Sequence, residues 1–155
     1  MPTANEVFNR LSARCSTTEL CLYDIQKKLD ATDLTEKEKE SIVRRLLDEG
    51  FVDEARYARA FVRDKFRFSG WGKVKIAQGL RARQISRTDI QEALTEIDDD
   101  DYRRALREAL KAKSRTLRGS SEYERNAKLI RFAQSRGYEM AVILKEVKMD
   151  GYDLD

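Results

Sequence analysis

The feature that most constrains the fold is a set of apolar positions that recurs at a nearly fixed distance along the chain. Five positions between residues 76 and 94 return 53 residues later, and four of the five pairs preserve bulk. The pairs are Ile76 with Leu129, Leu80 with Ala133, Ile85 with Tyr138, Ile90 with Ile143 and Leu94 with Val147. Tandem repetition over this length is typical of small units that cannot bury a core alone and pack end to end.

The N-terminal part of the chain belongs to the same series. Ile25, Leu29 and Leu34 precede the first three of those positions by 51 residues, and Ile42 and Leu46 precede the last two by 48. The first repeat therefore has three extra residues before its third helix. Tyr57 and Phe61 likewise recur as Tyr102 and Leu106. Within every repeat the apolar residues follow the three-to-four spacing of an amphipathic helix.

The fold class predicted from this pattern is all-α, with nine helices arranged as three tandem three-helix repeats in an elongated, curved body. The expected boundaries place the first repeat at residues 1–52, the central basic repeat at 53–97 and the third at 98–155. Helix starts are indicated by a capping box at Ser16 to Glu19, by Thr35, by Ser86 and by the acidic run Asp98 to Asp101. Glycine-containing breaks fall at Gly50, Ser69 to Gly72, Gly119 to Ser121, and Gly137.

The central repeat concentrates positive charge. Between Arg56 and Arg87 ten Arg or Lys stand against one acid, Asp64, so this segment carries +9 by difference in a chain whose net charge is +3. Like charges this close together repel one another. A solvated helix face is one interpretation, but phosphate groups or an acidic protein partner explain the excess better.

The arginines of the first helix of this repeat share one side. On a helical wheel Arg56, Arg63 and Arg67 fall within about 40° of one another, and Arg59 lies about 40° further round. Tyr57, Phe61 and Phe68 share another face. Tyr57, Phe61 and Tyr102 sit at core spacing, and we expect these three in the core. The sequence leaves two interpretations open for Trp71, which stands between two glycines: a plug at the junction of two helices, or a platform for a nucleic-acid base.

Several classes of function are disfavoured. The chain has no histidine, and Cys15 and Cys21 alone cannot supply the four ligands of a zinc site, so both are interpreted as small core residues. The four consecutive aspartates from Asp98 fit no calcium loop. No nucleotide-binding loop or nucleophile arrangement is present, and we expect no enzyme activity, cofactor or metal. Without a long apolar run or a signal-peptide core, a monomeric cytoplasmic protein is expected.

An ordered series of short motifs runs from the end of the first repeat into the third. The motifs are Gly50-Phe51-Val52-Asp53, Arg56-Tyr57-Ala58-Arg59-Ala60-Phe61, Gly70-x-Gly72 with Ile76 and Leu80, Gln84-Ile85-Ser86 with Ile90 and Ala93-Leu94, and then Leu129, Phe132 and Arg136-Gly137-Tyr138. In order and spacing they resemble the RecX family, bacterial regulators of the recombinase RecA, over nearly the whole chain. Gln84 stands where the family usually has glycine, and Ala133 where a bulkier apolar residue is usual.

The resemblance implies a non-enzymatic protein that lies along the helical groove of the RecA filament on DNA. It further implies restraint of ATP hydrolysis, strand exchange and the co-protease function behind the SOS response, with weaker, phosphate-driven binding to single- or double-stranded DNA. The candidate contacts to RecA or DNA are Arg56, Arg59, Arg63, Arg67, Lys73, Lys75, Arg81 and Arg83, among which Arg56, Arg63, Arg67, Lys73 and Lys75 form the narrower set. A stand-alone helical DNA-binding protein and a structural adaptor are the alternatives.

Overall fold

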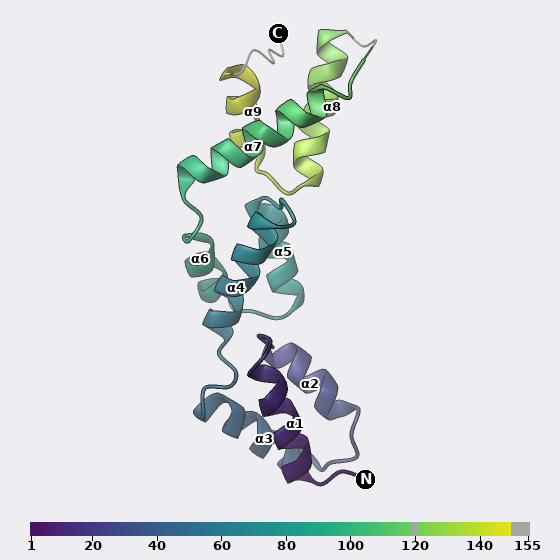
Figure 1. The fold of residues 1–155 in the computed structure, drawn as a ribbon, viewed down its shortest axis with the longest axis vertical. Coiled ribbons are helices and arrows are strands. Elements are labelled where there is room, and N and C mark those ends of the chain that lie inside the picture. Colours follow the sequence, from purple (N-terminus) through teal and green to yellow (C-terminus); the bar gives the residue numbers. More distant parts are fainter. Residues whose placement is uncertain (119–120, 150–155) are drawn as a thin grey trace. The chain divides into compact units, whose positions relative to one another are not determined.

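The computed structural model describes residues 1–118 and 121–149, which contain nine α-helices and no strand. The helices are α1 (Ala4–Cys15), α2 (Leu22–Asp30), α3 (Glu36–Asp48), α4 (Glu54–Arg67), α5 (Lys73–Ala82), α6 (Arg87–Leu94), α7 (Asp99–Ser114), α8 (Glu122–Ser135) and α9 (Met140–Met149) (Figure 1). The predicted all-α class, with helices in groups of three, is confirmed. Of the predicted break at Gly119 to Ser121, residues 119 and 120 lie outside the described residues.

Most helix starts are set by the local side chains that the sequence indicated. Thr35 forms a reciprocal capping box with Glu38, because its Oγ1 accepts the Glu38 N–H at 3.2 Å while Glu38 Oε1 accepts the Thr35 N–H at 2.9 Å. Ser86 and Asp98 likewise accept the N–H group three residues further on, at 3.1 and 3.0 Å. These side chains satisfy N–H groups that the helix itself leaves unpaired.

The predicted capping box at Ser16 to Glu19 is wrong. Ser16 ends α1 instead, where both its N–H and its hydroxyl donate to Ser12 O, at 3.1 and 3.0 Å. The next helix begins only at Leu22, after Cys21, which supplies no side-chain capping bond. A capping box needs the helix to follow its first residue directly, and here a loop intervenes.

Residues with a left-handed backbone conformation follow the ends of several helices. Gly50 and Gly137 have φ values of +76° and +93°, as their positions after apolar helical segments predicted. Gln84 takes φ +60° at the end of α5, although a side chain in this conformation costs about 1 to 2 kcal/mol. The turn is held by the Ile85 N–H, which donates to Leu80 O at 3.1 Å. The left-handed helix end is therefore kept without glycine.

The chain divides into two compact units whose boundary falls inside helices. Unit 1 comprises Met1–Phe61 and Leu80–Ala93, and unit 2 comprises Val62–Gly79 and Leu94–Asp155. α4 contributes its first half to unit 1 and its second half to unit 2. The repeat boundaries at residues 52/53 and 97/98 stay predictions.

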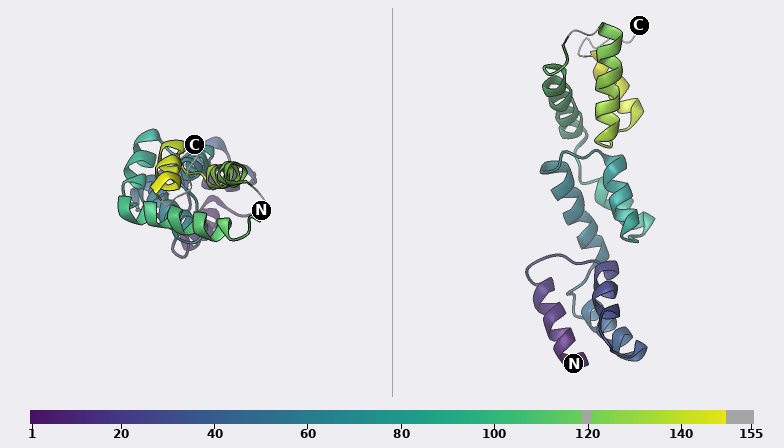
Figure 2. Two further views of the ribbon diagram at one scale, coloured as in Figure 1. Left: turned by 90° about the horizontal axis from the view of Figure 1, so that it is seen from above. Right: turned by 90° about the vertical axis from the view of Figure 1, so that its right-hand side faces the viewer.

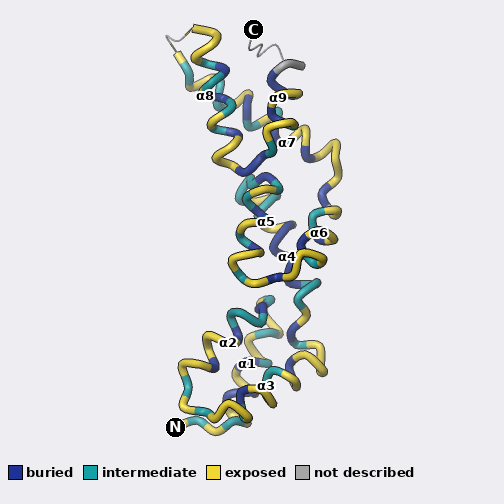
Figure 3. The backbone as a smooth tube through the Cα atoms, turned by 180° about the vertical axis from the view of Figure 1, so that it is seen from behind, coloured by how far each residue is buried: buried dark blue, intermediate teal, exposed yellow. Residues whose placement is uncertain are grey.

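Unit 1 is built around α1, α2 and α3, whose buried faces meet (Figure 3). The buried cluster consists of Val7, Phe8, Leu11, Leu20, Ile25, Leu29, Ile42, Leu46 and Val52. The Phe8 ring meets the Phe51 ring edge to face at 6.1 Å between centroids, and the Arg45 guanidinium lies 3.7 Å from the Phe8 centroid. Apolar burial therefore supplies most of the stability of this part, with Arg45 covering its edge.

The cysteines lie beside this core. Cys21 is fully buried and Cys15 is half-buried against the same cluster. Burial raises the pKa of both thiols, and at Cys15 the negative charge of Glu19 adds to the effect. Both side chains therefore stay protonated near neutral pH, as expected for packing residues.

The C-terminal helices α7, α8 and α9 pack together in unit 2 (Figure 2). Leu106, Leu129 and Ile143 are fully shielded from solvent, and Ala133 is buried beside them in α8. The sequence did not predict the buried carboxylate of Glu146, which has no exposed surface. Its Oε2 accepts from Arg107 Nε at 3.2 Å, so the buried charge has a cationic partner.

Unit 2 also contains a close backbone contact, here called the glycine junction. The Gly72 N–H donates to Arg136 O at 2.7 Å, and the Val74 N–H donates to Gly137 O at 2.9 Å. A Cβ on Gly72 would lie 2.5 Å from Gly137 C, and one on Gly137 would lie 2.6 Å from Lys75 N. Only residues without side chains allow this approach.

Tyr102 joins three segments next to the glycine junction. Its ring is buried, and its hydroxyl group donates to Glu139 Oε1. The Tyr102 hydroxyl oxygen in turn accepts the Lys73 N–H at 2.9 Å. Burial, followed by the hydrogen bond to Glu139, raises the pKa of Tyr102 far above its usual value. The phenol therefore stays protonated and keeps both bonds. Tyr57, Phe61 and Tyr102 are all buried, as predicted.

Across residues 1–118 and 121–149, no helix combines the length and the apolar character that a bilayer span requires. In the same ranges no group of three or more His, Cys, Asp or Glu is arranged to hold a metal ion. Asp98 instead caps α7, and Asp101 pairs with Arg104 at 2.9 Å, so the acidic run is a helix start, as predicted.

Candidate partner-binding surface

The eight predicted contact residues divide between the two units. Unit 1 holds Arg56, Arg59, Arg81 and Arg83, and unit 2 holds Arg63, Arg67, Lys73 and Lys75. The two groups are described separately below, because they belong to different compact bodies.

In unit 1, Arg56 takes part in the fold itself. Its Nε donates to Glu19 Oε2 at 2.6 Å, and its Nη2 donates to Phe51 O at 3.2 Å. The Leu22 N–H donates to Glu54 Oε2 at 3.2 Å. We call these bonds, which fix the start of α4 to the first repeat, the carboxylate junction. The Arg56 guanidinium is thus engaged by a partner 37 residues upstream, while its side chain stays 38% exposed, and its role as a contact to RecA or DNA stays a prediction.

The other unit 1 residues differ in exposure. The Arg83 guanidinium lies 5.0 Å from the Phe61 ring centroid, so it covers a buried aromatic side chain. Arg81 is exposed and Arg59 is half-buried. Arg81 is thus the most accessible predicted contact in this unit.

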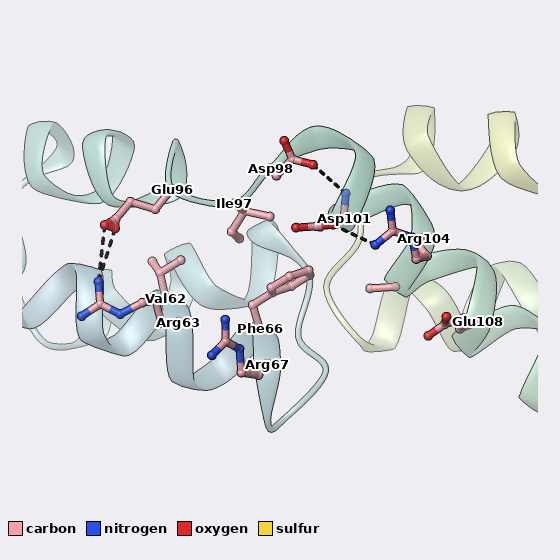
Figure 4. A pocket seen from close by; sticks show the side chains of 11 residues that line it. Val62, Arg63, Phe66, Arg67, Glu96, Ile97, Asp98, Asp101, Arg104 and Glu108 are labelled. Atoms are coloured by element: carbon pink, nitrogen blue, oxygen red, sulfur yellow. Dashed lines mark hydrogen bonds and ion pairs between the residues drawn. The ribbon is translucent and has the colours of Figure 1, made fainter.

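In unit 2 a groove of about 590 Å³ lies between the second half of α4 and the start of α7 (Figure 4). Its lining combines an apolar floor with three arginines and four acids. The floor includes Val62, Phe66, Ile97 and Ala105, the arginines are Arg63, Arg67 and Arg104, and the acids are Glu96, Asp98, Asp101 and Glu108. A groove with both signs of charge over an apolar base suits a protein partner as well as an anion.

The charges in the groove are unequally paired. Arg63 Nη1 lies 3.4 Å from Glu96 Oε1, a long contact between exposed groups, and Arg104 pairs with Asp101 at 2.9 Å (Figure 4). Arg67 is exposed and has no ion pair within the part of the chain that the structure describes. Of the predicted stripe, Arg63 and Arg67 therefore come together at the groove, and Arg67 is the cation most available to a partner.

The turn between α4 and α5 carries the remaining candidates. Lys65 Nζ and Lys75 Nζ lie 5.0 and 4.7 Å from the Trp71 ring centroid, and Lys73 Nζ lies 4.7 Å from the Tyr102 ring. Trp71 is half-buried, so its indole supports two ammonium groups beside the helix junction. The half-buried ring at the helix junction fits the first interpretation of Trp71, a plug between two helices, and its use as a platform for a base stays a prediction.

One aromatic residue of this turn departs from its neighbours on the helical wheel. Phe68 shares a predicted face with Tyr57 and Phe61, which are buried, but Phe68 itself is 79% exposed. α4 ends at Arg67, so the helical spacing no longer determines the direction of the next side chain. The following Ser69-Gly70 sequence was the available signal that the helix ends here.

Comparison with known proteins identifies the architecture. A model of the RecX second three-helix domain matches residues 53–94, and one of the third three-helix domain matches residues 98–145. The regulatory protein RecX of Pseudomonas fluorescens is 34% identical over 114 residues, which cover 74% of this chain and 72% of the relative. That of Pseudomonas putida is 31% identical over 132 residues, covering 85% and 81%. The crystal structure of RecX from Lactobacillus salivarius shares the fold, with a TM-score of 0.86, 17% identity, and coverage of 94% and 95%.

The helices in groups of three define an all-α helical-repeat protein. The matched domains and the relatives more than 30% identical narrow this class further. The chain belongs to the RecX family of regulatory proteins.

Proposed function

We propose that this regulatory protein binds the RecA filament assembled on DNA and inhibits its recombinase, ATPase and co-protease activities. DNA repair and the SOS response would be modulated as a result. Membership of the RecX family carries the proposal, and the amphipathic groove of unit 2 supports it, because a protein filament offers apolar and charged surface together. The role requires no catalytic group and no cofactor from this chain.

The proposed mechanism is mechanical. A helical-repeat protein that contacts successive protomers along the filament groove blocks entry of the second strand. It also hinders the subunit movements that accompany ATP turnover. Arg63, Arg67, Lys73 and Lys75 are the proposed contacts from unit 2, and Arg81 is the most exposed one from unit 1.

The test is the ATPase of RecA on single-stranded DNA, measured with and without this protein. Inhibition is expected with the natural chain and weaker inhibition with Arg67→Glu, because the substitution places an acid at the exposed rim of the groove. Arg131→Glu makes the same charge change at an exposed site of α8 outside the groove and serves as control. Absence of both inhibition and co-sedimentation with filaments contradicts the proposal.

The alternative is a stand-alone DNA-binding protein, which the exposed Arg67 and the lysines around Trp71 also favour. Charge reversal of Arg63 and Arg67 together separates the two. It should abolish DNA affinity if phosphate contacts are the whole interaction, but only weaken filament binding if RecA supplies other contacts. Binding to DNA that is tight, salt-sensitive and independent of RecA favours the alternative.

A further inference from the structure

We propose that the turn between α4 and α5 binds single-stranded DNA by stacking a base on Phe68. This ring is 79% exposed, yet the backbone that carries it is fixed. The Phe68 N–H donates to Asp64 O at 2.9 Å, and the Trp71 N–H closes the turn by donating to Lys65 O at 3.0 Å. An aromatic ring presented from a fixed turn loses little conformational freedom when a flat ligand covers it.

Cations from separate parts of unit 2 surround the turn. Lys65 and Lys75 are positioned against the Trp71 ring, and Arg67 adjoins Phe68 and is exposed. Arg136, from the end of α8, places Nη1 3.5 Å from where a Cβ on Gly70 would lie. The glycine junction holds Arg136 at this turn, because the backbone carbonyl of Arg136 accepts the Gly72 N–H.

The counter-charge near the turn is small. Asp64 Oδ2 lies 4.0 Å from Lys65 Nζ, the limit of an ion pair, and both side chains are partly or largely exposed. An anionic ligand at this turn therefore meets the four cations Lys65, Arg67, Lys75 and Arg136 against the single nearby acid Asp64. Phosphates spaced along a strand can contact these cations while the base between them covers Phe68.

The combination of an exposed ring with surrounding cations selects the ligand class. Bases of a duplex are stacked on each other and do not offer their faces, whereas those of a single strand do. An acidic peptide would use the cations but would gain little from a bare phenyl ring. Single-stranded nucleic acid uses both features, because every base has a face for stacking and a phosphate beside it.

The inference extends the DNA contact of the proposed function but needs no recombinase, so it is tested on the full chain alone. Trp71 is the only tryptophan, and its fluorescence should change when a short oligothymidylate is added. Phe68→Ala should lower the affinity by about 5- to 100-fold, the loss expected for one stacked base. Phe68→Tyr keeps a ring and should restore most of the binding.

Tyr123→Ala is the matched control, because Tyr123 is 73% exposed on α8 and stands between two glutamates instead of among cations. It should leave the affinity unchanged. Phe68→Ala should also leave the slope of log affinity against log salt unchanged, whereas Lys75→Ala should reduce its magnitude by about 0.7. Circular dichroism of each variant checks that the helices are intact.

Three results would overturn the inference. One is equal affinity of Phe68→Ala and the natural chain for oligothymidylate. Another is equal binding of a strand of the same length made of abasic sites, which means that phosphates alone are recognised. The last is equal binding of polyglutamate, which points to an acidic protein partner. Each result leaves the RecA ATPase assay unaffected, so failure of the inference is distinguishable from failure of the proposed function.

Discussion

The carboxylate junction of unit 1 and the glycine junction of unit 2 fix the two ends of the same stretch of chain by different physical means. At the first, Glu19 and Glu54 accept hydrogen bonds from Arg56 and from the Leu22 N–H. At the second, two backbone bonds join segments more than 60 residues apart, with no charged group involved. The first junction therefore depends on pH and salt, whereas the second depends on the absence of side chains.

The largest effect is expected at Gly137. Gly137→Ala combines a left-handed φ of +93° with a Cβ that would collide with Lys75, and should lower the free energy of unfolding by about 2 to 5 kcal/mol. Gly50→Ala is the control, since φ is +76° there but no atom lies within 4 Å of the added Cβ. It should cost only about 1 to 2 kcal/mol. Equal losses in urea denaturation would show that conformation, not close approach, governs the junction.

Removal of one hydroxyl next to the glycine junction should have a smaller effect. Tyr102→Phe leaves Glu139 and the Lys73 N–H without their shared partner, and should cost about 1 to 3 kcal/mol. Tyr138→Phe removes a hydroxyl that makes no hydrogen bond within residues 1–118 and 121–149, and should be nearly neutral. Comparable losses in the two variants would mean that the three-way bond at Tyr102 contributes little.

At the carboxylate junction the expected energies are lower. The Arg56 and Glu19 side chains are 38% and 29% exposed, so a double-mutant cycle with alanine at both positions should give a coupling of up to about 1 kcal/mol. Added salt should weaken this coupling and leave the cost of Gly137→Ala unchanged. A salt-independent coupling would indicate that packing, not charge, holds Arg56.

The smallest effect concerns Glu54. Burial raises the pKa of this carboxyl, the Leu22 N–H opposes the shift, and the nearby charges of Asp89, Asp24 and Asp53 add to it. A raised folded-state pKa contributes stability at low pH that is lost as the pH rises through it.

Glu54→Gln keeps an oxygen for the Leu22 N–H without the charge, so it should be slightly more stable than the natural chain at pH 7. This difference in stability should shrink as the pH is lowered toward the ordinary glutamate pKa of about 4.3. Thermal unfolding at several pH values measures it, and Glu40→Gln, at an exposed position of α3, should show no such trend. A gap that widens in acid would reverse the sign assigned to Glu54.

The sequence predicted those features whose causes lie within a few residues. Thr35, Ser86 and Asp98 cap helices because each meets an N–H group three residues away. The features that it did not predict have distant or abrupt causes. The contact between Arg56 and Glu19 spans 37 residues, and Phe68 is exposed because the helix ends one residue earlier.

The candidate surface shows the same limit. Helical spacing placed Arg63 and Arg67 on one side of α4, where the groove brings them together. Spacing could not show that Arg104 of α7 lines the same groove, or that four acids do so as well. It also could not show that Arg136 reaches Gly70. Those neighbours are fixed by packing between repeats, and a single sequence carries no direct signal of such contacts.

The division of α4 between the two units has a consequence for proteolysis. Proteases cleave chain that is exposed and locally unfolded, and linkers between compact bodies are their usual targets. Here the first crossing lies between Phe61 and Val62, both buried and both within α4, and the other two, after Gly79 and after Ala93, also fall within helices, α5 and α6. Limited digestion should therefore spare this boundary, and the two units should not be recovered as separate stable fragments.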